Sequence, residues 1–341
     1  MKSLNVNQNP GFELECYHNV RLSILDNNED FINWFHSHFV NLVLYKSNKE
    51  IVPYIRFENH IDIYSEVLSE EPVKKVGNWV DSIKKCIDHN NYVIAFLNWS
   101  NILQSRYYKE DKDMVHECLI FGYCDKNQEF EILAFDVNGL PYTKVSIPFS
   151  ILSKELDHII DFHLRKQKWF TYYGFPVSKI IKKPFNFNSL NKQKLFFGMD
   201  RHRYISSYNN NSEFAGGCSI NLYLSELFQK ICDESEHHKR NDFFKQSEYW
   251  KIMNLKLILH KNIMISRIKL LKNQSFSYEL IKIEEYFVKC LQELKIILAL
   301  SKKFTKTMDL NYLQNISSRF NKVYEHEFRA TYQMLDYLVK L

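Results

Sequence analysis

The N-terminal half of the chain alternates between helical and strand patterns of hydrophobic residues. Apolar residues recur at the spacing of one helical face in segments 16–24, 76–90 and 148–164. A polar cluster from Asp26 to Asn28 follows the first segment and predicts its end, and Ser150 or Ser153 can cap the third. Each segment is therefore predicted to be an amphipathic helix.

Runs rich in Val, Ile, Leu and aromatic residues lie between the second and third of these helices. Their composition and length predict strands at 92–99, 114–124 and 129–137. Only "DKNQ" separates the last two runs, which predicts a hairpin. With 8 Gly and 7 Pro the chain has few turn residues, so an all-β fold is not expected. The pattern favours an α+β domain with an antiparallel sheet.

The character of the sequence changes near residue 185. Segment 186–218 is rich in Asn and Ser and ends in Gly216–Gly217, which predicts a connection. Beyond it the pattern is almost wholly helical, with Ser or Asp caps and short loops that favour antiparallel neighbours. The helices are expected at 219–239, 242–271, 277–304 and 309–341. We therefore expect a catalytic-type domain over 1–185, a connecting segment over 186–218 and an all-α helical domain over 219–341.

Composition and charge exclude several classes of protein. The N-terminus has no apolar signal region, and no apolar run is long enough to span a bilayer. We therefore expect a cytoplasmic protein that does not associate with a membrane. Seven cysteines without a C-x-x-C motif indicate free thiols. A net charge of +5 does not indicate nucleic-acid binding. The basic clusters Ser178–Pro184 and Arg201–Arg203 are either solvated surface or a dock for an acidic partner.

Cys16 and His116 are the candidate catalytic residues. Cys16 stands at the start of the first predicted helix, where the helix dipole favours a thiolate. His116 is a polar residue at the start of an apolar strand, and imidazole is a common base for a cysteine nucleophile. The alternative is that Cys16 is core and His116 a satisfied strand histidine. Other histidines, at His36, His38, His237 and His238, lack the ligand set of a metal site, so no metal is expected.

The hairpin suggests a partner for His116. If Asp125 to Asn127 form a three-residue loop, paired positions sum to 252 and Asp136 stands opposite His116. A change of one residue in the loop would turn Asp136 to the other face, and a loop of five residues would place Asn138 opposite instead. Asp136, with Asn138 as the alternative, is therefore the candidate that orients the imidazole.

The order of these motifs resembles a known family. "ECYHN" at the head of a helix, the strand "YVIAFLNW", the hairpin "HECLIFGYCDKNQEFEILAFD" and a helix after "IPFS" resemble the papain-like domain of the butirosin-biosynthesis acyltransferase family. The layout is also similar to that of the amide synthases of closthioamide-type biosynthesis. The resemblance implies a papain-like, cysteine-protease-like N-terminal domain with Cys16 as nucleophile, His116 as base and Asp136 as orienting acid.

The resemblance also implies an activity and its partners. Members of this family move an acyl group from the phosphopantetheine thioester of an acyl or peptidyl carrier protein to a small amine or diamine, and need no cofactor beyond that arm. By the same resemblance Asn98, Trp99 and Ser100 are expected to line the acyl pocket, although they are equally consistent with a plain strand end. The alternative functions are a cysteine peptidase or amidase of the same fold and a catalytically silent binding module.

One departure from the family concerns the oxyanion hole. Relatives with peptidase activity place a Gln about six residues before the cysteine, whereas Pro10 stands there in this chain. Gln8 and Asn9 are near but out of register. The backbone N–H of Cys16 is therefore the expected oxyanion donor.

Overall fold

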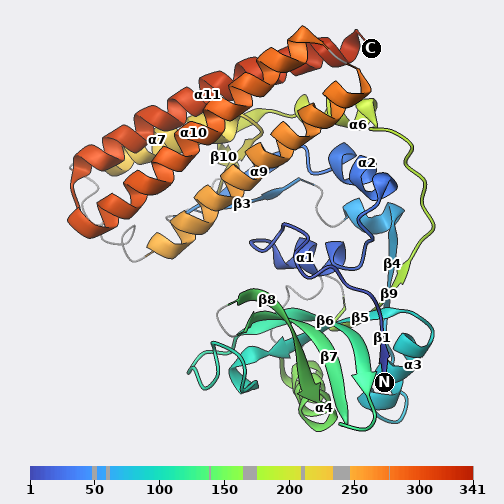
Figure 1. Cartoon of the computed structure of the whole chain (residues 1–341). Coiled ribbons are helices and arrows are strands. Elements are labelled where there is room, and N and C mark those ends of the chain that lie inside the picture. The colour runs from blue at the N-terminus through green and yellow to red at the C-terminus, as the bar shows by residue number, and fades with distance from the viewer. Residues whose placement is uncertain are drawn as a thin grey trace. The chain divides into compact units, whose positions relative to one another are not determined.

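The computed structural model describes residues 1–47, 52–58, 62–137, 140–163, 175–208, 212–232, 246–275 and 277–340. The chain forms two compact units, and each is built from two separate stretches of sequence (Figure 1). The N-terminal unit comprises Met1–Phe31 and Ile61–Asn186, and the C-terminal unit comprises Ile32–His60 and Phe187–Leu341. The expected combination of antiparallel sheet and C-terminal helices is confirmed.

The N-terminal unit is built on a seven-stranded antiparallel sheet in the order β4-β9-β5-β6-β7-β8, with β1 paired to β6. The strands and helices expected from the hydrophobic pattern are present. Neither Ser150 nor Ser153 caps α4, because Pro148 holds the N-cap position and no side chain bonds there. The elements are β1 (Lys2–Ser3), α1 (Cys16–Leu22), η1 (Asp62–Glu66), β4 (Leu68–Pro72), α3 (Trp79–Asp88), β5 (Tyr92–Asn98), η2 (Trp99–Asn101), β6 (Val115–Cys124), β7 (Glu129–Val137), β8 (Leu140–Pro148), α4 (Phe149–His158), η3 (Ile159–His163) and β9 (Val177–Lys182).

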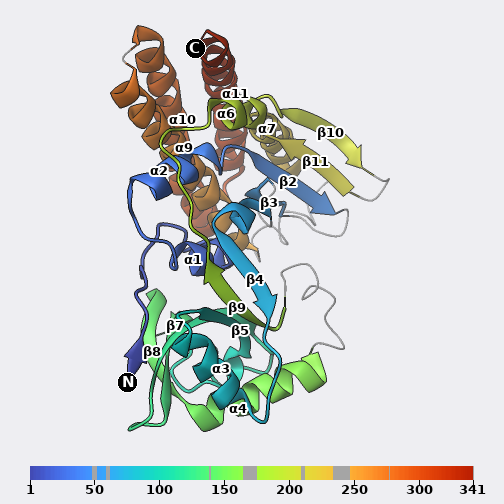
Figure 2. The same cartoon turned by 90° about the vertical axis from the view of Figure 1, so that its right-hand side faces the viewer.

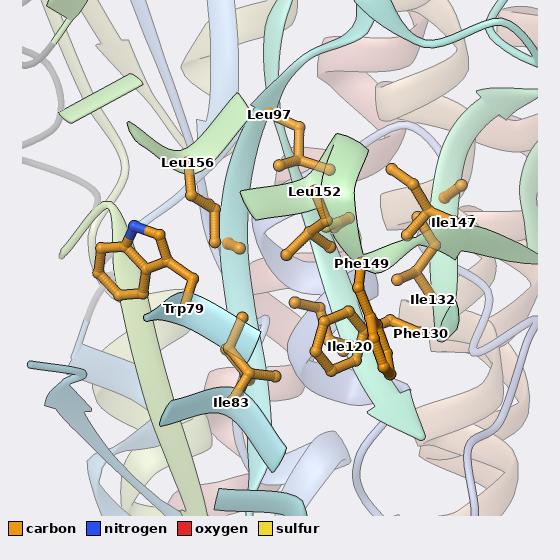
Figure 3. Packing of buried hydrophobic residues seen from close by; sticks show 14 of the residues in the cluster. Trp79, Ile83, Leu97, Ile120, Phe130, Ile132, Ile147, Phe149, Leu152 and Leu156 are labelled. Carbon is orange, nitrogen blue, oxygen red and sulfur yellow. The ribbon is translucent and has the colours of Figure 1, made fainter. Parts of the chain in front are cut away.

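The main core of this unit lies between the sheet and helices α3 and α4 (Figure 3). Trp79 and Ile83 of α3 and Leu152 of α4 pack there against residues of β6 and β7 that include Cys118, Ile120, Phe130, Ile132 and Ala134. Helix α1 contacts β6 through Arg21, which bonds Glu117. Since Glu117 and the core residue Cys118 are neighbours in a strand, their side chains point to opposite faces. The sheet therefore has α1 on one face and the α3–α4 core on the other.

The β6–β7 hairpin differs from the expected one in two ways that cancel. Its loop runs over 125–128, one residue longer than expected, so that Tyr123 pairs with Phe130. A bulge between Ile120 and Gly122 then restores the predicted pairing, with Leu119 opposite Leu133. Gly122 is suited to this position because a Cβ there would lie 2.9 Å from the carbonyl oxygen of Lys2 in β1.

The C-terminal unit contains a four-stranded sheet, in the order β10-β11-β2-β3, and the long helices (Figure 2). Among the described residues, no helix combines the length and apolarity needed to cross a membrane. Ser277 and Asp309 cap α10 and α11, as the sequence predicts for these helices. The elements are α2 (Glu29–Ser37), which begins in the other unit, β2 (Leu42–Ser47), β3 (Tyr54–Phe57), α6 (Lys192–Met199), β10 (Arg203–Tyr208), β11 (Ser212–Gly216), α7 (Ser219–Cys232), α9 (Ser247–Gln274), α10 (Tyr278–Thr307) and α11 (Leu310–Val339).

The described residues of the predicted connecting segment 186–218 form regular elements of this unit. The segment contains α6 and the β10–β11 hairpin, and β11 pairs with β2, where Phe214 stands opposite Tyr45. Strand pairing between segments so far apart leaves no trace in local composition, which is why the Asn-rich stretch looked like a linker. The predicted boundary near 185 agrees with the end of the N-terminal unit at Asn186.

Segment 32–60 was expected to belong to the N-terminal domain but packs with the C-terminal helices. Arg267 of α9 is fully buried and donates to the carbonyl oxygens of His36 at 2.7 Å and His38 at 2.6 Å. Burial lowers the pKa of Arg267 to about 9. His260 of the same helix donates to the carbonyl oxygen of Val40 at 2.8 Å. These bonds satisfy the backbone polar groups between α2 and β2 and fix the segment to α9.

Replacing Lys261 by methionine is expected to destabilise the C-terminal unit. Lys261 and Glu327 form a buried ion pair at 2.5 Å, and each side chain is less than a twentieth exposed. Removing the ammonium leaves the buried Glu327 carboxylate without its cation, with the amide of Asn221 still donating to it, which we expect to lower the free energy of unfolding by about 3–5 kcal/mol in urea titrations. Lys251→Met, which breaks an exposed pair with Glu248, is the control and should cost under ~1 kcal/mol. Equal losses of unfolding free energy in the two variants would show that the buried ion pair stabilises the unit no more than the exposed one.

Candidate active site

Cys16 and His116, separated by a hundred positions in the chain, meet in the N-terminal unit. Cys16 is the first residue of α1, and its Sγ lies 2.9 Å from Nδ1 of His116 in β6. Both residues are of intermediate exposure. The predicted position of Cys16 in the first helical turn is confirmed, and the predicted Cys–His pair is present.

The hydrogen bonds of His116 define its tautomer. The backbone N–H of Glu117 donates to Nδ1 at 3.1 Å, and an N–H can only donate. Nδ1 is therefore the lone-pair nitrogen, and the imidazole proton is on Nε2. In this tautomer the Cys16 thiol donates to Nδ1, and the same nitrogen can accept the thiol proton during a reaction.

The resting pair is neutral, which differs from the thiolate expected at a helix start. Burial raises the pKa of the Cys16 thiol well above its ordinary value, and the Glu117 carboxylate raises it further. Burial also lowers the pKa of His116 to about 4. A single short helix does not offset this loss of hydration, because α1 spans 7 residues and no side chain caps it. At neutral pH the imidazole of His116 is therefore unprotonated and the thiol of Cys16 keeps its proton.

Arg21 and two carboxylates form a charged group beside the pair. Arg21 donates to Glu117 at 3.1 Å and to Glu70 at 2.8 Å, and its guanidinium lies 3.7 Å from the centre of the Tyr17 ring. Burial raises the pKa of Glu117, while Arg21 acts in the opposite direction. The group ties α1 to β4 and β6 and so holds the helix that carries Cys16.

Asp136, the predicted orienting acid, has other partners. Its carboxylate accepts a hydrogen bond from Tyr107 at 3.0 Å and lies 3.4 Å from Arg106. The backbone of Asp136 is left-handed, with φ 49°, which takes the residue out of the regular alternation of β7. In the described part of the chain, no contact joins Asp136 to His116. The alternative, Asn138, lies outside the described residues.

An aromatic ring holds His116 in place of a carboxylate. The ring of Phe135 is stacked on the imidazole, with centroids 4.2 Å apart and planes 15° from parallel. Phe135 also lies 5.8 Å from the ring of Tyr142 in β8 and 6.4 Å from that of Tyr107. The structure therefore positions the imidazole by stacking on Phe135, whose own ring packs beside Tyr142 and Tyr107.

Phe135→Ala is expected to impair the site more than Asp136→Asn. Removing the stacked ring frees the imidazole to rotate and should slow acylation of Cys16 about tenfold, measured by intact mass with an activated ester. Asp136→Asn keeps an acceptor for Tyr107 and should leave the rate nearly unchanged. In a triad that depends on its acid, the same change costs about 10⁴-fold, and a loss of that size would restore Asp136 as orienting acid.

The three residues expected to line an acyl pocket have partners inside the protein. Asn98 donates to Asp113 at 2.8 Å, and its Oδ1 accepts from the backbone of Ser100. Trp99 is fully buried in the α3–α4 core, and its indole donates to the carbonyl oxygen of His116. These contacts shape the end of β5 and support the backbone of His116. A role in binding an acyl chain stays a prediction.

Tyr142 and Gln8 are the site residues that the sequence did not reveal. Tyr142 is 2% exposed, and its hydroxyl lies close enough to Cys16 to lower the pKa of the thiol, against the larger effects of burial and Glu117. Gln8 donates to the carbonyl oxygen of Tyr142 at 3.2 Å. Gln8 was noted only for being out of register with the family, and one tyrosine among 21 gave no signal.

The predicted basic clusters are largely paired with acids. Lys182 in β9 lies 3.1 Å from Asp26, and Arg201 lies 3.4 Å from Glu58. Among the described residues, no group of three or more His, Cys, Asp or Glu side chains is arranged to hold a metal ion. His237 and His238 lie outside the described residues. Docking of an acidic carrier protein at Lys182 or Arg201 stays a prediction.

Comparison with the models of known protein families and with curated proteins finds no match for this sequence. The conclusions on function therefore depend on the site. The fold and the site together define a mixed α/β protein with a Cys–His pair formed between a helix and a strand of an antiparallel sheet.

Proposed function

We propose that the chain is a cysteine-dependent acyltransferase that forms amides. In this proposal an acyl chain moves from the phosphopantetheine thioester of an acyl or peptidyl carrier protein to Cys16, and then to a small amine or diamine in non-ribosomal natural-product biosynthesis. The observation that carries the proposal is the distance of 2.9 Å between Cys16 Sγ and His116 Nδ1. No metal or organic cofactor is needed for this chemistry.

We also propose that the N-terminal unit is a papain-like domain. The support is the placement of the pair, with the nucleophile at the first residue of a helix and the base on a strand of an antiparallel sheet. The carboxylate expected to complete a triad, that of Asp136, accepts a hydrogen bond from Tyr107 instead. The resemblance to the butirosin-biosynthesis acyltransferase family belongs to the same proposal.

The proposed reaction proceeds through an acyl-enzyme. His116 Nδ1 takes the thiol proton as Sγ attacks the thioester carbonyl, and the proton then leaves on the pantetheine thiol as its C–S bond breaks. In the second half, a neutral amine attacks the Cys16 thioester and His116 takes the amine proton. As the C–S bond breaks, His116 passes that proton to the sulfur, and Cys16 is regenerated as a thiol. Exchange between thioesters is nearly isoenergetic, and the amide makes the second step downhill.

The neutral pair favours this substrate over a peptide. A thioester carbonyl is more electrophilic than an amide carbonyl, so it demands less of a thiol that is protonated at rest. His116, whose pKa is lowered to about 4 by burial, is free at neutral pH to accept a proton from the amine. In the peptidase alternative the leaving amine must receive a proton from His116 before the C–N bond breaks, whereas a thiol group can leave as a thiolate and depends less on that proton.

The test uses intact-mass measurement with an acylated carrier protein and a panel of amines. We expect a mass increase equal to the acyl group, located on Cys16 by peptide mapping, and an amide product once amine is added. Release of free acid with no amine incorporated would support the hydrolase alternative. The absence of any adduct, with a thiol inert to iodoacetamide, would support the silent binding module.

A further inference from the structure

Tyr142 belongs to the group of aromatic side chains that surrounds the catalytic pair. It stands opposite Phe135 in the β7–β8 register, and Phe135 in turn is stacked on His116. The Tyr142 ring is 2% exposed, so its hydroxyl is fixed by packing and not by solvent. A second contact fixes the backbone at the same point, since Gln8 donates to the carbonyl oxygen of Tyr142.

The hydroxyl of Tyr142 is an unsatisfied polar group next to Cys16. It is buried and makes no hydrogen bond with good geometry among the described residues. It is nevertheless near enough to the sulfur that Cys16 and Tyr142 alter each other's pKa, although burial is the largest effect on both. A buried hydroxyl without a partner is unfavourable, so such a group points to a ligand or an intermediate that satisfies it.

We propose that the Tyr142 hydroxyl is an oxyanion donor of this site. The inference rests on the proposed function, because an oxyanion forms only if Cys16 attacks a carbonyl. When the Sγ–C bond forms and the thiol proton passes to His116, the carbonyl electron pair moves to the oxygen, which is then two bonds from Sγ. The Tyr142 hydroxyl, already beside Sγ, donates a hydrogen bond to that oxygen and keeps its own proton.

The environment of Tyr142 suits a donor that does not itself ionise. Burial raises the pKa of Tyr142 well above its ordinary value, so the hydroxyl stays protonated throughout the working pH range. When the intermediate collapses, the electron pair returns to the carbonyl, the bond to the leaving thiol breaks, and that thiol takes the proton from His116. The Cys16 N–H, at the first position of α1 and outside its hydrogen-bond ladder, is the second donor.

This assignment also accounts for Gln8. The glutamine expected in the oxyanion hole of related peptidases is absent from the position before Cys16, where Pro10 stands. Gln8 reaches the site by a different route and bonds the carbonyl oxygen of Tyr142. Gln8 is therefore a positioning residue that holds β8, and the donor to the oxyanion is the tyrosine.

The test compares two reactions of Cys16 in Tyr142→Phe. Acetylation by p-nitrophenyl acetate forms an oxyanion, whereas alkylation by iodoacetamide uses the same thiol without one. We expect the variant to acetylate Cys16 about 100-fold more slowly while it alkylates at nearly the wild-type rate, both followed by intact mass. Tyr123→Phe removes a hydroxyl that bonds Asp88 elsewhere on β6, and it should change neither rate.

Every other outcome either contradicts the role of Tyr142 as oxyanion donor or tests that role separately from the proposed acyl transfer. Equal slowing of both reactions would mean that Tyr142 acts on the thiol, and no slowing would mean that it has no role; both overturn the inference. If wild type acetylates with the phenyl ester but not with a carrier thioester, the proposed function fails while the role of Tyr142 is still decided. Should Tyr142→Phe fold poorly, a fluorinated tyrosine at this position, which donates more strongly, should instead accelerate acetylation alone.

Discussion

Replacing Cys16 by alanine is expected to abolish both the acyl-enzyme and the amide product. The sulfur is the atom to which the acyl group is bound, and no other described cysteine contacts His116. Loss of a covalent nucleophile typically costs about 10⁶-fold in turnover, so the remaining rate should equal the uncatalysed aminolysis of the thioester. The measurement is single-turnover transfer from an acylated carrier protein to an amine, followed by intact mass and product analysis.

Two further variants make this result interpretable. Cys124→Ala removes another partly exposed thiol of β6, away from His116, and should retain full activity. Cys16→Ser keeps a nucleophilic atom but one far less easily deprotonated, so a trace of stable ester is the most it should form. The melting temperature of Cys16→Ala should be measured beside its activity, so that loss of the nucleophile is separated from loss of the fold. Product formation by Cys16→Ala at the wild-type rate would refute the proposed function.

The parts of the structure that follow from local periodicity could be predicted from the sequence. The all-buried strand β5, the hairpin and the long helices α9 to α11 each carry their own signal in spacing and caps. Cys16 and His116 could be predicted as candidates in the same way, because the start of a predicted helix and the start of a predicted strand each place one reactive side chain in a defined position. What linked them was the resemblance, since spacing gives no distance between elements.

Contacts between segments far apart in the sequence could not be predicted. Nothing in segment 32–60 shows that Arg267 will bond its carbonyl groups, and nothing in segment 186–218 shows that β11 will pair with β2. The predictions for both segments assigned residues to a domain by their neighbours in the sequence. In the structure, the described residues of both segments belong to the C-terminal unit. Domain boundaries drawn from composition fail where backbone groups find distant partners.

Asp136 shows how a correct register can still give a wrong contact. The sum of paired positions was predicted correctly because a longer loop and a bulge cancel. The pairing ends before His116, however, and the left-handed backbone at Asp136 directs its carboxylate to Tyr107. Asp adopts a positive φ more readily than most residues other than glycine, but the residue type alone does not show that Asp136 has one.

Replacing His116 by glutamine is expected to lower the rate of Cys16 acylation by about 10⁴-fold, because it removes the only base in contact with the thiol among the described residues.

The dependence of the acylation rate on pH should change in the same variant. In wild type, His116 must be neutral, so the rate should fall as pH drops through about 4, where the imidazole gains its proton. In His116→Gln the thiol must ionise without help, so the rate should rise with hydroxide concentration across the neutral range. His89→Gln, on the exposed end of α3, is the control.

The alkaline side of the wild-type profile separates a neutral pair from an ion pair. In a thiolate–imidazolium pair, activity is lost as the imidazolium gives up its proton in mildly alkaline solution. Here the imidazole is already unprotonated and the pKa of the thiol is raised well above its ordinary value by burial and by Glu117, so the rate should hold or rise at alkaline pH. A bell-shaped profile with an alkaline loss near the ordinary thiol pKa would show that Cys16 and His116 rest as ions, and that substrate binding or some other change in the surroundings overcomes the burial that the structure shows.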